Sequence, residues 1–406
     1  MPTIRIHPTE HRGFWRVGLW ACFLGSSWTW VIGMLWPVLL VRDYGPAGWF
    51  VFAIPNVVGA AAMGWMLSSP EASRRVLERH LGAALRFSDV TIAYHVFAVV
   101  WIYTRLMGWG GPLAVAAAAL VITAGGLQRR AVVLVGAALV TAASLAMFVA
   151  WLILAGPTWA QAAPPRLTQL DLALLMPAMA AGFLLCPYLD LTFHRARQAT
   201  EPAAGRRAFL LGFGGVFLVM IAFSLFYSGA LEGVMGRGPA PVLPRRWLIV
   251  LSVHLVLQAA FTIAVHLREV IRHGGHAAAH RTASLAVAAV ALAWWAHAQP
   301  VRDFHGLSVG EAVYRGFLLI YGLIFPAYVW LCMLPSRSRI PPHIARLMLV
   351  VAILIALPMA YQGFLAGRAM WVPLALAVLA AARVVLVWIF PPASSSESSS
   401  SLQSPP

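Results

Sequence analysis

Long apolar runs recur along the whole chain, and they constrain its fold more than any motif does. Of the 406 residues, 61% are hydrophobic and only 10% are charged. An α-helix needs a run of about 18 to 20 apolar residues to cross the hydrocarbon core of a bilayer. Because such runs follow one another at short intervals, the sequence predicts an all-α polytopic membrane protein.

The apolar runs predict twelve spans. The first is longer than the apolar core of a cleavable signal peptide, and further spans follow it, so we expect it to stay in the protein. Residues 1–392 would form one transmembrane domain, and the Ser-rich tail of residues 393–406 is predicted to be disordered. The expected spans lie near residues 14–41, 47–68, 87–108, 111–127, 131–155, 170–193, 208–231, 247–267, 282–298, 312–334, 347–367 and 370–390.

Arginines divide unevenly between the two sides of this predicted bundle. The chain has no lysine, so its 29 basic residues are all arginines; nineteen lie on the side of the N-terminus, nine on the other, and Arg383 falls in the last span. Since arginine is enriched in cytoplasmic loops, we expect a multi-pass protein of the cell (inner) membrane with both termini in the cytoplasm. The net charge of +16 then reflects topology and anionic headgroups, and no nucleic-acid partner is expected.

Polar residues inside the spans carry the functional information, because neither lipid nor apolar neighbours require them. The middle of the first span contains Gly25, Ser26, Ser27 and Thr29. A helix interrupted there would expose backbone groups to an ion or solute. Alternatively, the small residues allow close packing and the hydroxyls bond to their own helix. Asn56 in the second span could bond across to the first, although close packing is again the alternative.

The sixth span ends in GFLLCPYLDLTFHRARQ, where a proline removes a backbone donor from the helical ladder. Asp190 and His194 are four residues apart and so share a helical face. Asp190 is a candidate site for a cation or proton, or for a gating pair with arginine; alternatively, it is an interfacial carboxylate in a salt bridge. The candidate residues in this stretch are Cys186, Tyr188, Asp190 and His194.

Two further spans contain candidate polar groups. In the eighth, His254, Gln258 and Thr262 recur every four residues and form a polar stripe on an apolar helix. The stripe would face the bundle or a wet cavity, or would only make interhelical hydrogen bonds. In the third, Asp89 and His95 are, like His194, candidates for a gate or proton relay. We expect no metal centre and no cofactor, apart from sodium as a coupling ion.

The run SSWTWVIGMLWPVLLVRDYGPAGWFVFAIPNVVGAAAMGW resembles the first core helices of the sodium:solute symporter family. The likeness lies in a small Ser/Thr-containing break, a Tyr-Gly turn and a Gly-rich second helix. It implies a LeuT-type fold of the APC superfamily, with five helices repeated in inverted orientation over residues 14–155 and 170–334 and extra helices over 347–390. It also implies that the patch at residues 25–29 coordinates a solute or sodium.

We therefore expect a secondary active transporter that moves a small polar solute, coupled to sodium or to protons, with the bilayer as its other partner. One alternative is a membrane-embedded enzyme acting on lipid, which would need acidic and His side chains to converge near a membrane face. Its candidates are Asp89, His95, Asp190, His194 and His266. No HExxH motif or recognisable nucleophile motif is present. A second alternative is a non-transporting sensor or scaffold on a transporter fold.

Overall fold

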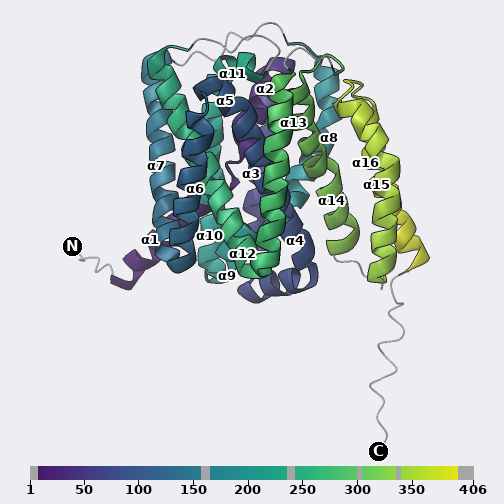
Figure 1. The fold of residues 1–406 in the computed structure, drawn as a ribbon. Coiled ribbons are helices and arrows are strands. Elements are labelled where there is room, and N and C mark those ends of the chain that lie inside the picture. The colour runs from purple at the N-terminus through teal and green to yellow at the C-terminus, as the bar shows by residue number, and fades with distance from the viewer. Residues whose placement is uncertain (1–7, 157–164, 236–242, 300–303, 335–339, 392–406) are drawn as a thin grey trace, which may run out of the picture.

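The computed structural model describes residues 8–156, 165–235, 243–299, 304–334 and 340–391, with side chains described from residue 15 onward (Figure 1). Within these ranges all regular structure is helical. Ten helices are long and apolar enough to cross a membrane, and one bent pair, α1 with α2, is an eleventh candidate. The all-α prediction is confirmed for these residues, and the number of long apolar helices agrees with a multi-pass membrane protein. The predicted tail lies outside the described residues.

The longer crossings contain short π-helical or 3-10 turns between α-helical parts. The π-helical turns are η1 (Val99–Tyr103), η3 (Gly212–Phe217), η4 (Ile320–Ile324) and η5 (Val329–Met333), and the 3-10 turn is η2 (Cys186–Leu189). The α-helices are α1 (Pro8–Trp28), α2 (Val31–Tyr44), α3 (Pro46–Met66), α4 (Pro70–Ala98), α5 (Thr104–Met107), α6 (Gly110–Gln128), α7 (Arg130–Ala155), α8 (Gln169–Leu185), α9 (Leu191–Gln198), α10 (Pro202–Leu211), α11 (Leu218–Met235), α12 (Arg245–Ala298), α13 (Val309–Leu319), α14 (Phe325–Tyr328), α15 (Pro342–Phe364) and α16 (Trp371–Ile389).

α12 reverses direction at Gly275, whose φ of 62° is left-handed and available to glycine without strain. His266 lies before this point and Thr282 after it, and a straight helix would separate them by about 24 Å. Yet His266 contacts Ser88, and Thr282 bonds to the adjacent Asp89. The two arms of α12 therefore pack side by side along α4.

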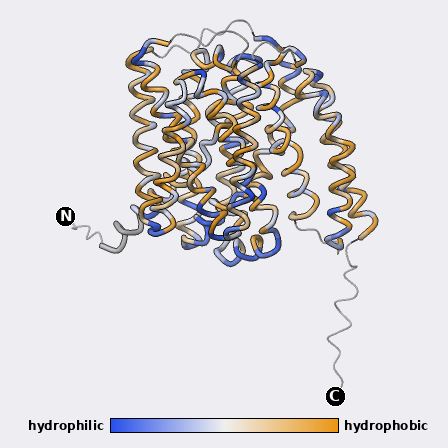
Figure 2. The backbone as a smooth tube through the Cα atoms, in the orientation of Figure 1, coloured by the Kyte–Doolittle hydropathy of each residue, from blue (hydrophilic) through white to orange (hydrophobic). Residues whose placement is uncertain are grey.

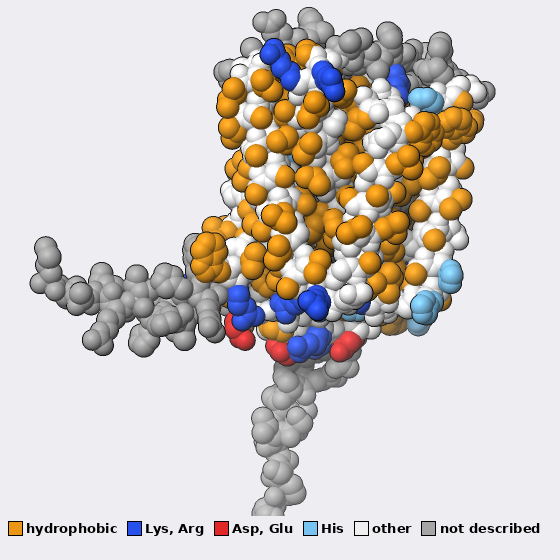
Figure 3. Space-filling model, turned by 60° about the vertical axis from the view of Figure 1, so that its left-hand side comes forward, with side chains coloured by type: hydrophobic (Ala, Val, Ile, Leu, Met, Phe, Trp, Pro, Cys, Tyr) orange, Lys and Arg blue, Asp and Glu red, His pale blue; other side chains and the backbone are white. Residues whose placement is uncertain are grey.

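The surface of the bundle has the polarity of a membrane protein. Hydrophobic side chains cover its middle, and arginines gather near both ends (Figure 3). Hydrophilic residues are concentrated at the end of the bundle where α1 begins (Figure 2). α16 finishes at that same end, so both described ends of the chain lie on one side (Figure 1). We call this end the arginine-rich side.

α15 and α16 form a pair at one edge of the bundle (Figure 1). Small residues such as Ala356 and Ala382 let the two helices approach closely, and Leu379 and Leu386 fill the space between them. The pair packs against α8 and η4. This edge becomes one wall of the cavity described below.

Candidate functional site

The first span is interrupted near its middle, directly after the predicted Gly/Ser/Thr patch. α1 ends at Trp28, α2 begins at Val31, and the two helices are bent by 56°. Trp30 is extended, with φ −77° and ψ 174°, so the helical ladder breaks there. A Cβ on Gly25 would lie 2.6 Å from the side chain of Val216, so this approach to η3 requires glycine.

The sixth predicted span is interrupted as well. α8 passes into η2 at Cys186, and Asp190 leaves the helical region with φ −78° and ψ 112° before α9 begins. Pro187 cannot donate a ladder hydrogen bond, which explains the break locally. Asp190 caps α9, because its Oδ1 accepts hydrogen bonds from the backbone N and the Oγ1 of Thr192, both at 2.7 Å.

The two interrupted spans meet at their breaks. Thr192 Oγ1 lies 3.2 Å from Ser27 Oγ, and the rings of Trp28 and Phe193 lie 4.8 Å apart. α1 rises from the side where α9 ends, and α2 ends on the side where α8 begins (Figure 1). The interrupted spans therefore run in opposite directions through the same part of the bundle.

Trp30 fills the space beside the first break. Its indole Nε1 donates to the carbonyl oxygen of Ser27 at 2.6 Å, which satisfies an acceptor that the break leaves free. Its ring lies 5.6 Å from that of His266 and 5.5 Å from that of Tyr321, centroid to centroid. Trp30 thus contacts both the α12 stripe and the η4 turn, although we did not predict it as a site residue.

His95 occupies the break from the side of α4. The backbone N of Val31 donates to His95 Nε2 at 3.3 Å, while His95 Nδ1 lies 2.7 Å from the carbonyl oxygen of Thr91. This pattern needs a neutral imidazole whose hydrogen sits on Nδ1. The predicted candidate His95 therefore supports a backbone donor that the interruption frees.

A buried acid–imidazole pair lies at the second break. Asp190 Oδ2 and His266 Nε2 are 3.8 Å apart, and both side chains are fully buried. Neither atom has a hydrogen-bond partner among the described residues. The other imidazole nitrogen, Nδ1, lies 3.0 Å from Ser88 Oγ. His266 is four residues beyond Thr262, so extending the predicted stripe by one step identifies it; Ser88 carries no comparable sequence signal.

The predicted stripe on α12 faces the inside of the bundle. Thr262 Oγ1 donates to the carbonyl oxygen of Ser26 at 3.3 Å, and Gln258 Nε2 donates to Ser144 Oγ at 2.9 Å. His254 is fully buried, and neither of its ring nitrogens has a partner in the described part of the chain. The stripe therefore mixes interhelical hydrogen bonds with unpaired polar groups.

The hydroxyls of the first patch are engaged within the protein. Ser27 Oγ donates to the carbonyl oxygen of Leu24, and Thr29 Oγ1 donates to that of Gly25, at 3.1 and 2.8 Å. Ser26 Oγ lies 3.0 Å from Thr141 Oγ1 of α7. Of the two explanations for this patch, bonding to its own helix thus accounts for Ser27 and Thr29.

Asn56 makes the bond across to the first span that its position suggested. Its Oδ1 accepts a 2.7 Å hydrogen bond from the indole Nε1 of Trp28. The bond ties α3 to the residue directly before the break. Asn56 thereby belongs to the wall of the central site as well as to a packing contact.

Two predicted gate residues lie elsewhere. Asp89 accepts hydrogen bonds from Arg281 Nε at 2.7 Å and from Thr282 Oγ1 at 2.6 Å, so it holds the second arm of α12. His194 Nδ1 lies 2.8 Å from Ser73 Oγ, and its Nε2 lies 3.0 Å from the carbonyl oxygen of Tyr188. Although His194 is four residues from Asp190, both its nitrogens are used in other contacts.

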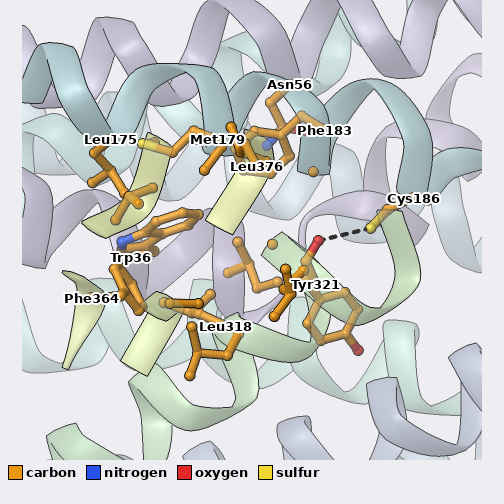
Figure 4. Close-up of a pocket in the computed structure, with 18 of the residues that line it drawn as sticks. Trp36, Asn56, Leu175, Met179, Phe183, Cys186, Leu318, Tyr321, Phe364 and Leu376 are labelled. Atoms are coloured by element: carbon orange, nitrogen blue, oxygen red, sulfur yellow. Dashed lines mark hydrogen bonds between the residues drawn. The ribbon is translucent and has the colours of Figure 1, made fainter. Parts of the chain in front are cut away.

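A cavity of about 70 Å³ adjoins both breaks. Trp30 borders it from the first break and Cys186 from the second, where the thiol donates to the carbonyl oxygen of Tyr321 (Figure 4). Asn56 contributes the amide group in its wall, while Trp36 and other aromatic and aliphatic side chains form most of the rest. The cavity is about half the volume of an apolar cavity of ~150 Å³ that holds benzene.

Four charged side chains close the end of the bundle opposite the arginine-rich side. Arg42 NH2 lies 2.6 Å from Glu311 Oε1, and Arg315 NH2 lies 2.6 Å from Asp43 Oδ2. Arg42 also pairs with Asp43 at 2.8 Å, and Arg315 with Glu311 at 2.9 Å. No side chain of the four is more than 11% exposed, so α2 and α13 are joined by a closed, buried ion-pair network.

A wider vestibule of about 580 Å³ lies on the arginine-rich side, between α1, α4, α9 and α10. Charged and polar side chains make up half of its wall, in contrast to the mainly apolar wall of the central cavity. The residues that line it include Arg16, Trp20, Glu71, Arg74, Gln198 and Glu201.

Compared with known proteins, the chain matches no family model, no curated protein and no solved structure. The function of the site is therefore argued from its own geometry.

Proposed function

We propose that the protein is a secondary active transporter for a small solute that binds where the two interrupted spans meet. The observation that carries this proposal is the antiparallel pair of breaks, joined by the contact between Thr192 Oγ1 and Ser27 Oγ. Interrupted helices place backbone groups and polar side chains deep in a bundle, where a continuous helix would bury them in its own ladder. Such deep polar groups have no role in a bundle that only anchors itself in lipid.

The order of the crossings supports an inverted repeat. With the two arms of α12 counted separately, the candidate crossings number twelve. Five of them precede residue 156, five lie between residues 169 and 333, and α15 and α16 follow. The interrupted span comes first in each group of five, and an odd number of crossings makes the second group enter from the opposite side. This is the arrangement that the resemblance to sodium:solute symporters implies.

The two ends of the bundle differ. The ion-pair network of Arg42, Asp43, Glu311 and Arg315 closes one end, whereas the vestibule lies between α1 and α9 at the other and shares no lining residue with the central cavity. We assign the arginine-rich side to the cytoplasm, which puts both termini there in a cell (inner) membrane. The structure then corresponds to a state that is sealed toward the outside.

The cavity wall bears on the kind of solute. Aromatic and aliphatic side chains predominate, and Asn56 contributes a hydrogen-bonding amide group. A small solute with an apolar part and one or two hydrogen-bonding groups fits this wall better than a fully polar one. Amines, amino acids with apolar side chains and ureides belong to this class, and sugars do not.

Uptake into proteoliposomes tests the proposal. A panel of amines, ureides and amino acids with apolar side chains is offered, one compound at a time, to liposomes that contain the purified protein. A proton or sodium gradient is imposed, and empty liposomes are the control. We expect uptake above the control for at least one compound, and thermal stabilisation of the detergent-purified protein by the same compound. A monodisperse protein that is neither stabilised by nor transports any of these compounds would contradict the proposal.

A membrane-embedded hydrolase is the second candidate. Ser88 Oγ, His266 and Asp190 form a chain of hydroxyl, imidazole and carboxylate, which is the order of groups that activates a serine nucleophile. Ser88 is fully buried and does not line the cavity, so transport is favoured. Covalent labelling of the wild type by a fluorophosphonate probe, with no labelling of Ser88→Ala, would instead support the hydrolase.

A further inference from the structure

We propose that the coupling ion of this transporter is a proton, bound by the pair of Asp190 and His266. The inference rests on the proposed transport function and adds the ion and the residues that bind it. It starts from the different contacts of the two Asp190 carboxylate oxygens. Oδ1 caps α9 through Thr192, while Oδ2 has no hydrogen-bond partner in the described residues and faces His266.

The pair has two states that differ by one proton. When Ser88 Oγ donates to His266 Nδ1, Nε2 carries the imidazole hydrogen and Asp190 is a carboxylate, so the pair has a net charge of −1. Uptake of one proton gives either an imidazolium beside a carboxylate or a neutral imidazole beside a carboxylic acid. The net charge is then zero. In the first form the added hydrogen is on Nδ1 and Ser88 Oγ turns to accept it, and in the second form the added hydrogen is on the Asp190 carboxyl group.

The separation of the two atoms links the proton to movement of the helices. At 3.8 Å, Oδ2 and Nε2 are farther apart than the roughly 2.7 to 3.2 Å of a hydrogen bond. Asp190 lies in the break before α9, whereas His266 belongs to the first arm of α12, so a small shift of one helix closes the gap. A proton that strengthens the bond between these atoms favours the shifted position, which is how an ion biases a two-state element.

A series of titratable groups connects the pair with the arginine-rich side. Glu269 lies on the next turn of α12, and its Oε2 is 3.6 Å from the Nε2 of His273, whose side chain is 32% exposed. Glu269 Oε1 is held by Arg268 at 2.6 Å. Successive steps of three or four residues along α12, about 5 to 6 Å each, therefore lead from the surface to His266.

The other titratable and charged groups near the pair make hydrogen bonds or ion pairs with other residues. His95 faces His266 across the ring of Trp30, and its two nitrogens contact Val31 and Thr91. Farther along α4, Asp89 is paired with Arg281 of the second arm of α12. Besides Glu269, Arg268 bonds to the carbonyl oxygen of Gly126. Asp190 and His266 thus remain the buried pair at the breaks whose facing atoms lack partners among the described residues.

The chemistry of these groups favours a proton over sodium. Hard cations bind through several oxygen ligands, whereas Asp190 Oδ2 faces imidazole nitrogen. Imidazole is the side-chain group that ordinarily exchanges a proton near neutral pH, and a carboxylate beside it can share that proton.

Infrared difference spectroscopy tests the proton site without any solute. Purified protein in lipid nanodiscs, labelled with ring-¹³C histidine, is titrated with acid while the carboxyl and imidazole bands are followed. We expect one proton to be taken up as a carboxylic-acid or imidazolium band in the wild type, and that band to be absent in Asp190→Asn. In His266→Gln its midpoint should shift by about one pH unit or more, because the two groups titrate as a pair.

Asp171→Asn is the matched control. Asp171 also takes part in a helix cap, at the start of α8, but it is only partly buried and lies far along the same span from the pair. This variant should keep the wild-type band and midpoint. Equal melting temperatures and size-exclusion profiles for all variants would show that lost bands do not reflect unfolding. A wild-type band that persists in Asp190→Asn with its midpoint unchanged in His266→Gln would overturn the site.

Transport measurements then separate the ion from the function. For a compound that the protein transports, an inward proton gradient in sodium-free buffer should drive accumulation by the wild type but not by Asp190→Asn. Accumulation driven by sodium and indifferent to the proton gradient would overturn this inference and leave the proposed function intact. If the pair titrates as expected but the protein transports no compound of the panel, the proton site is supported and the proposed transport function is contradicted.

Discussion

Thr192 Oγ1 lies 3.2 Å from Ser27 Oγ across 165 positions of sequence, and this contact joins the two helix breaks. The same hydroxyl group is 2.7 Å from Asp190 Oδ1, so Thr192 links both interrupted spans at once. A hydroxyl that serves two partners in a buried site holds the geometry of both.

Removing this hydroxyl should loosen the site. We expect Thr192→Val, which keeps the shape of the side chain, to cost about 1 to 3 kcal/mol of stability, because it leaves buried acceptors without their donor. Thr192→Ser retains the hydroxyl and should lose less than half as much. Thermal unfolding of both variants in the same detergent checks this. Equal melting temperatures for the valine variant and the wild type would show that the link does not stabilise the fold.

Gly59 is expected to be intolerant of any side chain. A Cβ at this position would overlap the backbone of Phe183 and Leu184, so Gly59→Ala should push α3 away from α8 and cost about 1 to 3 kcal/mol. Gly82→Ala is the control, because Gly82 is an exposed residue of α4 and nothing lies within 4 Å of a Cβ added there. That substitution should stabilise the helix by up to about 1 kcal/mol. Urea or thermal unfolding of the two variants should therefore give opposite signs.

The reversal of α12 depends on the backbone freedom of Gly275. Its φ of 62° should make Gly275→Ala destabilising by about 1 to 2 kcal/mol, although no atom lies within 4 Å of the added Cβ. Gly275→Asn should cost about as much, since its ψ of −158° lies outside the left-handed helical region that asparagine tolerates. Similar losses of melting temperature in the two variants would identify backbone strain as the cause. An alanine variant as stable as the wild type would argue against the reversal at this residue.

Cys186 reports on opening of the central cavity, because its buried thiol lies in the cavity wall. In a variant with Cys22→Ala and Cys332→Ala, we expect slow alkylation by a small maleimide. Adding Glu311→Gln should speed it about tenfold or more, because loss of a buried ion pair weakens the closed end. Glu232→Gln, which breaks the exposed pair with Arg166, should leave the rate unchanged. Equal rates in both variants would show that the network does not control access.

Much of the helical frame could be predicted from the sequence, because long apolar runs and prolines act locally. The patch before Trp30 and the CPYLD stretch indicated the two breaks, since glycine, serine and proline weaken a helical ladder wherever they occur. Asn56 was likewise expected to reach the first span, and it bonds to Trp28.

The pairings between distant segments could not be predicted. Glu311 and Arg42 are 269 positions apart, and no periodicity in either segment points to the other. Asp89 has the appearance of a gate residue in the sequence, but it pairs with Arg281 because α12 reverses and brings its second arm to α4. Ser88 acquires its role only through contact with His266. Each of these relationships is set by tertiary packing rather than by neighbours in sequence.

Because the two oxygens of Asp190 have different contacts, substitution by asparagine and substitution by alanine would remove different interactions. Asparagine keeps an oxygen that can accept both bonds from Thr192, so it preserves the start of α9 while taking away the acid. Alanine removes the helix cap and the acid together, and its phenotype would confound misfolding with loss of proton binding. The asparagine variant can therefore remove proton binding at this residue while the cap of α9 stays intact.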